Sequence, residues 1–177
     1  MFVEMRRGIH LEDKILQLFP PNDYSLPIFI LLYSSIATVV VSHIHKPRVI
    51  MRLIEMHLLI AVTRQITILL IALEPPSGLI VLRDIFLENT FYPNSTPLTK
   101  DLFFSGHVAS LWLYYLITKN PTLKLLHLAG VILMAFMILS MRVHYSYDVY
   151  GAILFTTILY KLPYWYKELR PKAARVK

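Results

Sequence analysis

Apolar residues in this chain gather in long runs that are separated by short polar stretches. A helix that crosses the hydrocarbon core of a bilayer needs roughly 20 such residues. Five segments come close to this length, and proline or charged residues mark their ends, as is typical of helix boundaries. The segments are residues 26–42, 49–73, 102–118, 123–141 and 145–162. The pattern predicts an all-α, polytopic membrane bundle of about five transmembrane helices, forming one domain over residues 1–177.

Two other parts of the chain have a different pattern. Residues 8–19 mix charged and apolar side chains over a length that is too short to span a membrane. An amphipathic helix lying in the membrane interface is the favoured interpretation of this segment. Residues 74–101 form the only long loop between the predicted helices, and long loops of this kind are often functional.

The composition strengthens the membrane interpretation. Hydrophobic residues make up 56% of the chain and charged residues only 16%, and the mean hydropathy is +0.54. The chain has no cysteine, which excludes disulfides, zinc–thiolate sites and cysteine nucleophiles. A net charge of +7 is compatible with nucleic-acid binding, but the basic residues flank the apolar runs. Membrane topology explains that placement. The expected partner is therefore a membrane, and binding to nucleic acid is not expected.

The distribution of Lys and Arg predicts the orientation. Five spans put the two termini on opposite sides of the membrane. The side of the N-terminus carries six basic residues: Arg6, Arg7, Lys14, Arg83, Lys100 and Arg142. The other side carries eleven: Lys46, Arg48, Arg52, Lys119, Lys124, Lys161, Lys167, Arg170, Lys172, Arg175 and Lys177. The positive-inside rule therefore favours a cytoplasmic C-terminus, with residues 163–177 as a basic cytoplasmic tail.

Ionisable residues stand at the starts of two apolar runs, where each would be costly if it faced lipid. The sequence DLFFSGH at 101–107 opens the third predicted span, and HYSYD at 144–148 opens the fifth. Both spans begin on the side of the N-terminus, and Arg64 lies in the half of the second span nearest that side. The topology therefore brings Asp101, His107, His144, Asp148 and Arg64 to one face of the membrane, which we expect to be the extracytoplasmic or lumenal leaflet.

The histidines suggest catalysis. On a helix, His144 and Asp148 share a face because they are four residues apart. A carboxylate bonded to one imidazole nitrogen fixes the tautomer and leaves the other nitrogen as a nucleophile or base. His107 is placed to act as a general acid for a leaving oxygen.

The neighbouring residues suggest a phosphate as the group that reacts. Backbone N–H groups at Ser105 and Gly106 can point at an anion, and a glycine lets it approach closely. Arg64 can donate two hydrogen bonds to a phosphate. The histidines on this side lack ligand spacing with a third partner, so neither a metal nor another cofactor is expected. The combination predicts metal-free phosphoryl transfer at the level of the lipid headgroups.

These residues resemble a known family. The pair KDLFFSGHV at 100–108 and HYSYDV at 144–149 is similar to the motifs of the type 2 phosphatidic acid phosphatase superfamily, and more closely to its sphingomyelin synthase-related branch. That branch has Gly-Asp-x-x-x-Ser-Gly-His-Thr followed by His-Tyr-(Thr/Ser)-x-Asp-Val, so Lys100 and Val108 differ from the pattern. RQITILLIALEPP at 64–76 is similar to the arginine-containing span and proline-rich stop of the branch, and the resemblance covers roughly residues 50–165.

The resemblance implies a role for each motif residue. His144 is expected to form a phosphohistidine and to be oriented by Asp148, while His107 protonates the leaving lipid alcohol. Asp101 matches the aspartate of the first motif, and Lys100 and Arg142 stand beside the two motifs. The candidate phosphate- or substrate-binding residues are Asp101, Ser105, Gly106, Arg64, Lys100 and Arg142.

Three functions fit these observations. The first is a lipid phosphotransferase that moves a phosphate-containing headgroup from a glycerophospholipid to a lipid alcohol such as ceramide or diacylglycerol, in the manner of a sphingomyelin synthase. The second is a lipid phosphate phosphatase that hydrolyses substrates of the phosphatidic acid type. The third is a non-catalytic membrane protein that binds lipid, in which the polar cluster only caps two helices.

Overall fold

The computed structural model describes residues 2–84 and 99–169, and the side chains of residues 3–84 and 99–162. The described residues form helices and no strand beyond one isolated β-bridge, so the predicted all-α class is confirmed. The α-helices are α1 (Phe2–Met5), α2 (Ser25–His43), α3 (Pro47–Leu70), α5 (Gly106–Ile117), α6 (Pro121–Ser140) and α7 (Ser146–Leu169), and η1 (Leu16–Leu18) is a single 3₁₀ turn.

Each of the five predicted apolar segments overlaps one of the longer helices. By length and composition, α2, α3 and α6 can cross a membrane, with 19, 24 and 20 residues. Pro47 and Pro121 begin α3 and α6, where the missing N–H of proline costs no hydrogen bond. The side chain of Asn120 caps α6 by accepting the Leu123 N–H at 3.1 Å. Residues 163–169 continue α7, while the rest of the predicted tail, 170–177, lies outside the described residues.

The third predicted span is a shorter helix than expected. It was predicted over 102–118, but α5 has only 12 residues and begins at Gly106, which gives a length of about 18 Å. Residues 102–105 are not helical because their backbone is held by α3: the Thr67 hydroxyl donates to Phe103 O at 2.9 Å. Leu102 and Phe104 are buried, 2% and 0% exposed, and anchor this non-helical segment in the core.

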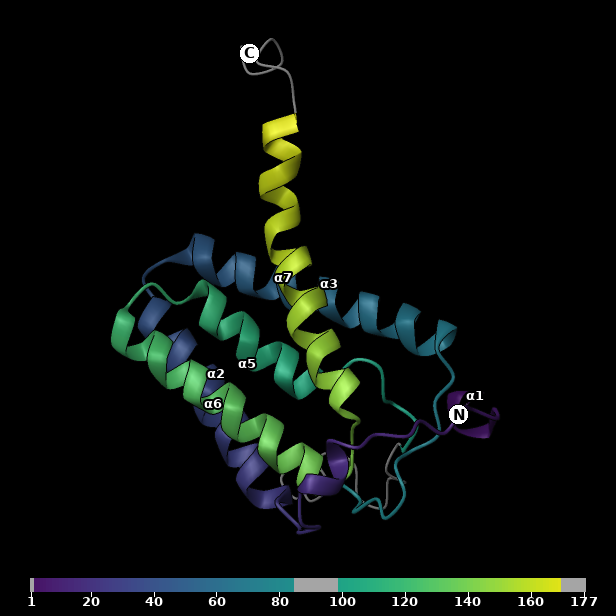
Figure 1. Cartoon of the computed structure of the whole chain (residues 1–177). Coiled ribbons are helices and arrows are strands. Elements are labelled where there is room, and N and C mark those ends of the chain that lie inside the picture. Colours follow the sequence, from purple (N-terminus) through teal and green to yellow (C-terminus); the bar gives the residue numbers. More distant parts are fainter. Residues whose placement is uncertain (1, 85–98, 170–177) are drawn as a thin grey trace.

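Helix α5 is the centre of the bundle. It contacts α2, α3, α6 and α7 (Figure 1), and Val108, Ala109, Leu111 and Leu113 are fully buried. A helix that is apolar all round is buried on every side. The first turn of α5 is therefore fixed by the whole bundle.

The ends of the helices have the arrangement that the alternating topology requires. At one end of the bundle α2, α5 and α7 begin and α3 and α6 end, and the N-terminal segment lies across the same end (Figure 1). At the opposite end, short connections join α2 to α3 and α5 to α6. Both sequence motifs thus lie at the end where the N-terminal segment is found.

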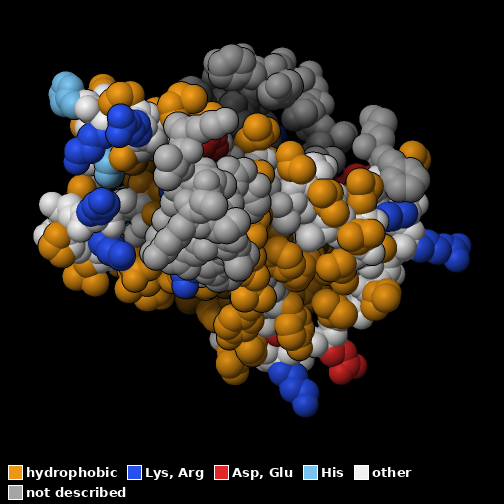
Figure 2. Space-filling model, turned by 90° about the horizontal axis from the view of Figure 1, so that it is seen from above, with side chains coloured by type: hydrophobic (Ala, Val, Ile, Leu, Met, Phe, Trp, Pro, Cys, Tyr) orange, Lys and Arg blue, Asp and Glu red, His pale blue; other side chains and the backbone are white. Residues whose placement is uncertain are grey.

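The outer surface is apolar. Large hydrophobic side chains are exposed on the helices that can span a membrane, including Leu58 at 64%, Leu70 at 78% and Ile132 at 65%. In Figure 2, hydrophobic side chains cover a large part of one face, and most of the Lys and Arg side chains lie at its margins. Such a surface fits a lipid environment.

The predicted interfacial helix over residues 8–19 is not formed; this prediction was wrong. The segment is mainly extended, with helical geometry only in η1. Its backbone pairs with the chain after α3, since Ile9 forms a parallel bridge with Leu73, Ile9 N–H donates to Ala72 O at 2.8 Å and Glu74 N–H donates to Ile9 O at 3.0 Å. These long-range bonds replace the internal bonds of a helix, and Leu16 is buried in the core.

Candidate active site

His144 and Asp148 form a buried pair at the start of α7. The His144 Nδ1 lies 3.1 Å from Asp148 Oδ2, and the two residues are 3% and 0% exposed. His144 precedes the helix, so the pair does not share a helix face as the spacing suggested. Instead, Asp148 reaches back and also accepts the N–H of Tyr145 at 2.9 Å, as the third residue of a capping box does. One carboxylate oxygen thus orients the His144 ring and caps α7.

Arg64 connects α3 to the first motif. Its Nε donates to Phe104 O at 2.7 Å, and its Nη2 donates to Asp101 Oδ1 at 3.0 Å. The guanidinium group is therefore held by a backbone carbonyl and by a carboxylate from the same short segment. Its side chain is 17% exposed. Arg64 keeps further N–H groups that can donate to an anion.

Gly106 makes this approach of Arg64 possible. A Cβ atom at position 106 would lie 2.9 Å from Arg64 Nη1 and 3.1 Å from Cζ. Both distances are shorter than ordinary van der Waals contact. The glycine of the first motif therefore creates room for the arginine.

The motif residues surround a cavity of about 380 Å³. Its polar lining includes Arg64, Asp101, Gly106, His107 and His144. These residues come from the end of α3, from the segment before α5, from the first turn of α5 and from the residue two before α7. The structure thus brings together two histidines, an arginine and a carboxylate, as the topology predicted.

His107 faces this cavity from the first turn of α5. Its ring packs edge-on against Phe29 of α2, with 5.7 Å between the ring centroids. Ser105 precedes it as the N-cap residue of α5. The Ser105 side chain is fully buried, and its Oγ has no hydrogen-bond partner among the described residues, so it does not line the cavity.

Like Ser105, the predicted phosphate-binding residues Lys100 and Arg142 lie outside the cavity. Lys100 donates from Nζ to Arg6 O and to Glu74 Oε1, both at 2.8 Å. Arg142 has a left-handed backbone with φ of 56°, and its Nη1 donates to Ser77 O at 2.8 Å. Both basic groups bind other parts of the chain at this end of the bundle.

The cavity continues inward to residues that the sequence motifs did not indicate. Its inner lining includes His57 and Ser110, with apolar neighbours such as Leu32 and Ile60. His57 lies two turns before Arg64 on α3, about 10 Å further along the helix. Its Nδ1 lies 2.9 Å from Leu53 O and its Nε2 3.3 Å from Tyr114 Oη. The sequence motifs give no indication of His57; only its spacing of seven from Arg64 could have placed it on the same helix face.

The described part of the chain contains no group of three or more His, Cys, Asp or Glu side chains arranged to hold a metal ion. Two of the polar groups that line the cavity are instead paired with carboxylates, Arg64 with Asp101 and His144 with Asp148. This donor set suits an anionic ligand.

Residues 100–166 match the family model described as PAP2 superfamily C-terminal. The match supports the type 2 phosphatidic acid phosphatase superfamily. It covers both sequence motifs and extends over α5, α6 and most of α7. No curated protein and no solved structure that was compared matches this chain.

The match to the PAP2 superfamily C-terminal model and the apolar helices together support a membrane-embedded protein of the lipid phosphatase or phosphotransferase type. The match includes His107, His144 and Asp148, while Arg64 lies outside it. The arginine is connected to the matched region by its bonds to Phe104 and Asp101.

Proposed function

We propose that this protein transfers a phosphate-containing headgroup from a glycerophospholipid to a lipid alcohol, such as ceramide or diacylglycerol, through a phosphohistidine at His144. The observation that carries the proposal is the arrangement of His144. Its Nδ1 is engaged by buried Asp148, which leaves Nε2 to react, and His144 lines the same cavity as His107 and Arg64.

The first half of the reaction breaks the bond between phosphorus and the diacylglycerol oxygen. His144 Nε2 attacks the phosphorus, and His107 gives a proton to the leaving oxygen. Arg64 and the N–H groups at the start of α5 bind the phosphate oxygens, whose negative charge is stabilised near a helix N-terminus. The products are diacylglycerol and a phosphohistidine that carries the headgroup.

The second half reverses these roles. The hydroxyl of the acceptor lipid loses its proton to His107, and its oxygen attacks the phosphorus while the bond to His144 breaks. The inner part of the cavity combines the apolar side chains of Leu32, Ile60 and Ala61 with the polar side chains of His57 and Ser110. Such a mixed lining suits an acceptor that carries both a hydrocarbon chain and a hydroxyl group, which favours headgroup transfer to a lipid alcohol.

A lipid assay tests the reaction. The purified protein in vesicles is incubated with headgroup-labelled phosphatidylcholine, phosphatidylethanolamine or phosphatidic acid, with and without ceramide. Transfer is expected to give a new labelled lipid only when the lipid alcohol is present. Release of phosphate without any new labelled lipid would show that the protein hydrolyses its substrate and does not transfer the headgroup. Turnover that is the same for the wild type and His144→Ala would exclude catalysis through this site.

We further propose that the site faces the extracytoplasmic or lumenal leaflet, because basic residues are more numerous on the other side. Single-cysteine variants test this directly, since the chain contains no cysteine. Ser77 and Lys119 are both exposed. Ser77 accepts a hydrogen bond from Arg142, at the end of the bundle where α7 begins, whereas Lys119 lies in the connection from α5 to α6 at the opposite end. We expect an impermeant thiol reagent to label Ser77→Cys from outside and Lys119→Cys only after permeabilisation; the opposite pattern would reverse the orientation.

A further inference from the structure

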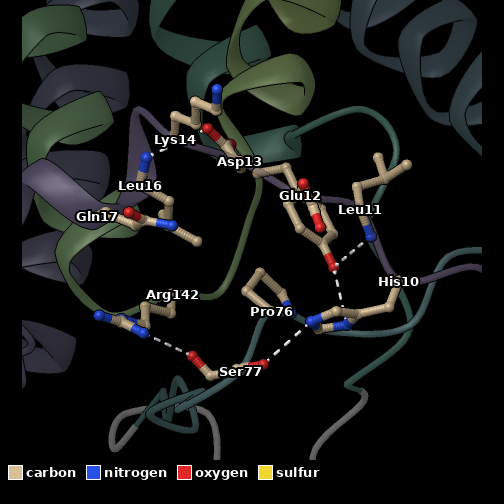
Figure 3. A pocket seen from close by; sticks show the side chains of 11 residues that line it. His10, Leu11, Glu12, Asp13, Lys14, Leu16, Gln17, Pro76, Ser77 and Arg142 are labelled. Atoms are coloured by element: carbon tan, nitrogen blue, oxygen red, sulfur yellow. Dashed lines mark hydrogen bonds between the residues drawn. The ribbon is translucent and has the colours of Figure 1, made fainter.

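Asp13 lies at the first turn of α7, although 133 positions separate it from the residue whose N–H it accepts. Its Oδ2 accepts the backbone N–H of Ser146 at 2.6 Å. Its Oδ1 accepts the N–H groups of Ile15 at 3.0 Å and Leu16 at 3.2 Å. The residue is only 7% exposed, and Figure 3 shows it on the N-terminal segment above the chain that leads into α7. The carboxylate thus joins the N-terminal segment to α7.

Two carboxylates hold consecutive N–H groups directly after His144. Asp148 accepts the N–H of Tyr145 at 2.9 Å, and Asp13 accepts the N–H of Ser146. Both are orphan donors of a helix start, and negative charge is favourable there. The backbone that carries the His144 ring is therefore fixed by two anions, of which only Asp148 belongs to the sequence motif.

The N-terminal segment also holds the side chain of Tyr145, which is 1% exposed. The Tyr145 hydroxyl accepts the N–H of Leu11 at 3.3 Å and donates to Glu74 O at 2.9 Å. Tyr145, the residue after His144, is thus held at its N–H by Asp148 and at its hydroxyl group by the backbone of residues far away in the sequence. A shift of the N-terminal segment would move this residue.

The chain between α6 and α7 separates two cavities. Val143 and His144 line the cavity of the candidate active site. Arg142 and Tyr145 line a second cavity of about 460 Å³, shown in Figure 3, with Asp13 and its neighbours on the other wall. The wall that carries His144 is therefore the short turn between α6 and α7, and Asp13 contacts this segment from the side of the second cavity.

We propose that Asp13 is a positioning residue that holds His144 in the geometry needed for attack on phosphorus. The proposal rests on the function proposed above. Asp13 contacts neither the substrate cavity nor the His144 ring. It acts through the Ser146 N–H, which fixes the turn from His144 into α7. A misplacement of a reacting group by about 1 Å can cost on the order of 100-fold in rate.

The experiment compares Asp13→Ala and Asp13→Asn with Glu12→Gln. Glu12 is the adjacent, exposed carboxylate on the wall of the same second cavity, so it controls for loss of charge. Rates are measured per folded molecule in the lipid assay. We expect Asp13→Ala to lower kcat by about 10- to 100-fold with little change in KM. Asp13→Asn should lose less, because its amide oxygen can still accept the Ser146 N–H, and Glu12→Gln should match the wild type.

A residue that only stabilised the fold would change the melting temperature and leave kcat per folded molecule unchanged. That result for both Asp13 variants would overturn the proposal. If Asp13→Ala does not yield folded protein, Asp13→Asn carries the test.

A second readout does not depend on turnover: the ¹⁵N signals of the His144 ring should shift in the Asp13 variants and stay fixed in Glu12→Gln. Unchanged His144 signals in the Asp13 variants would reject the positioning role. A wild type without turnover, equal to His144→Ala, would reject the proposed function instead, and the His144 signals would still decide the role of Asp13.

Discussion

Arg64 on α3 donates from Nε to the backbone carbonyl oxygen of Phe104 at 2.7 Å, across 40 positions of sequence. A second bond from Nη2 reaches Asp101 at 3.0 Å. The planar guanidinium can make both bonds and still present an N–H edge to the cavity. The ammonium group of a lysine is a point charge and cannot reproduce this geometry.

Arg64→Lys should therefore reduce kcat/KM even though the charge is kept. The loss of a charge-assisted hydrogen bond to the reacting phosphate corresponds to about 10- to 100-fold. Steady-state kinetics in the lipid assay measure the effect. Wild-type kinetics for Arg64→Lys would show that Arg64 is only a structural tie between α3 and the first motif.

Gly106→Ala should displace the Arg64 guanidinium, because the new Cβ would lie 2.9 Å from Nη1. We expect loss of activity and a decrease of about 1–3 kcal/mol in the free energy of unfolding. The matched control is Gly130→Ala in α6, where the nearest atom is a side-chain methyl of Leu111 at 3.3 Å. Comparable activity loss in both variants would contradict a specific contact with Arg64.

His107→Gln should lower the rate with natural lipids by about 10²–10⁴-fold, the usual effect of losing a general acid. The expected loss is much smaller with a synthetic phosphodiester whose leaving group is a nitrophenolate, since this group needs no proton. Measuring both substrates separates acid catalysis from phosphate binding. Equal losses with both substrates would assign His107 to binding.

Arg142→Ala should leave kcat/KM near the wild-type value, because Arg142 binds Ser77 O and lines the second cavity. The measurement compares kcat/KM of Arg142→Ala and of Arg64→Lys in the same lipid assay. A large loss of activity in Arg142→Ala would return this residue to the phosphate-binding set that the sequence suggested.

The N-terminal segment should loosen in acid. The Lys100 ammonium group and the Gly8 N–H donate to Glu74 and lower the pKa of its carboxyl below the usual 4.5. Burial raises the pKa of Glu4, but hydrogen bonds from Lys100 N–H and Thr99 outweigh this and lower it overall. A carboxylate with a depressed pKa stabilises the fold above its unfolded pKa, and this stabilisation disappears as the pH falls through the folded pKa.

We therefore expect the stability difference between the wild type and Glu74→Gln to be constant near neutral pH and to shrink below about pH 4.5. Denaturation curves at a series of pH values measure it. A difference that does not change down to pH 3 would contradict the role of these ion pairs.

The sequence was sufficient to predict the longer helices and the end of the bundle at which the two motifs meet. Long apolar runs with prolines at their starts predicted α3 and α6. The contact between His144 and Asp148 was also expected, but it forms at the cap of α7 and not along a helix face. The sequence was not sufficient where long-range hydrogen bonds decide the backbone. The segment 8–19 looked amphipathic, but its N–H groups bind residues after α3 and before α7.

Proximity in sequence was misleading for two basic residues. Lys100 and Arg142 stand next to motif residues, yet each turns away from the cavity. Arg142 adopts a left-handed backbone, which no sequence pattern indicated, and Lys100 is held by Glu74 and by a carbonyl of the N-terminal segment. His57 lines the cavity but is far in sequence from both motifs. A single histidine on an apolar helix forms no recognisable motif, so the sequence offered no reason to select it.

The bond between Asp13 and Ser146 has a consequence for biosynthesis. A chain is made from its N-terminus, so residues 8–16 emerge long before their partners exist. Ile9 can form its bridge only after Leu73 has been synthesised, and Asp13 can accept the Ser146 N–H only after the start of α7 has been synthesised. Residues 8–16 therefore reach their final positions only after residues much later in the sequence have been made. His144 acquires its final surroundings only when the N-terminal segment has bound the start of α7.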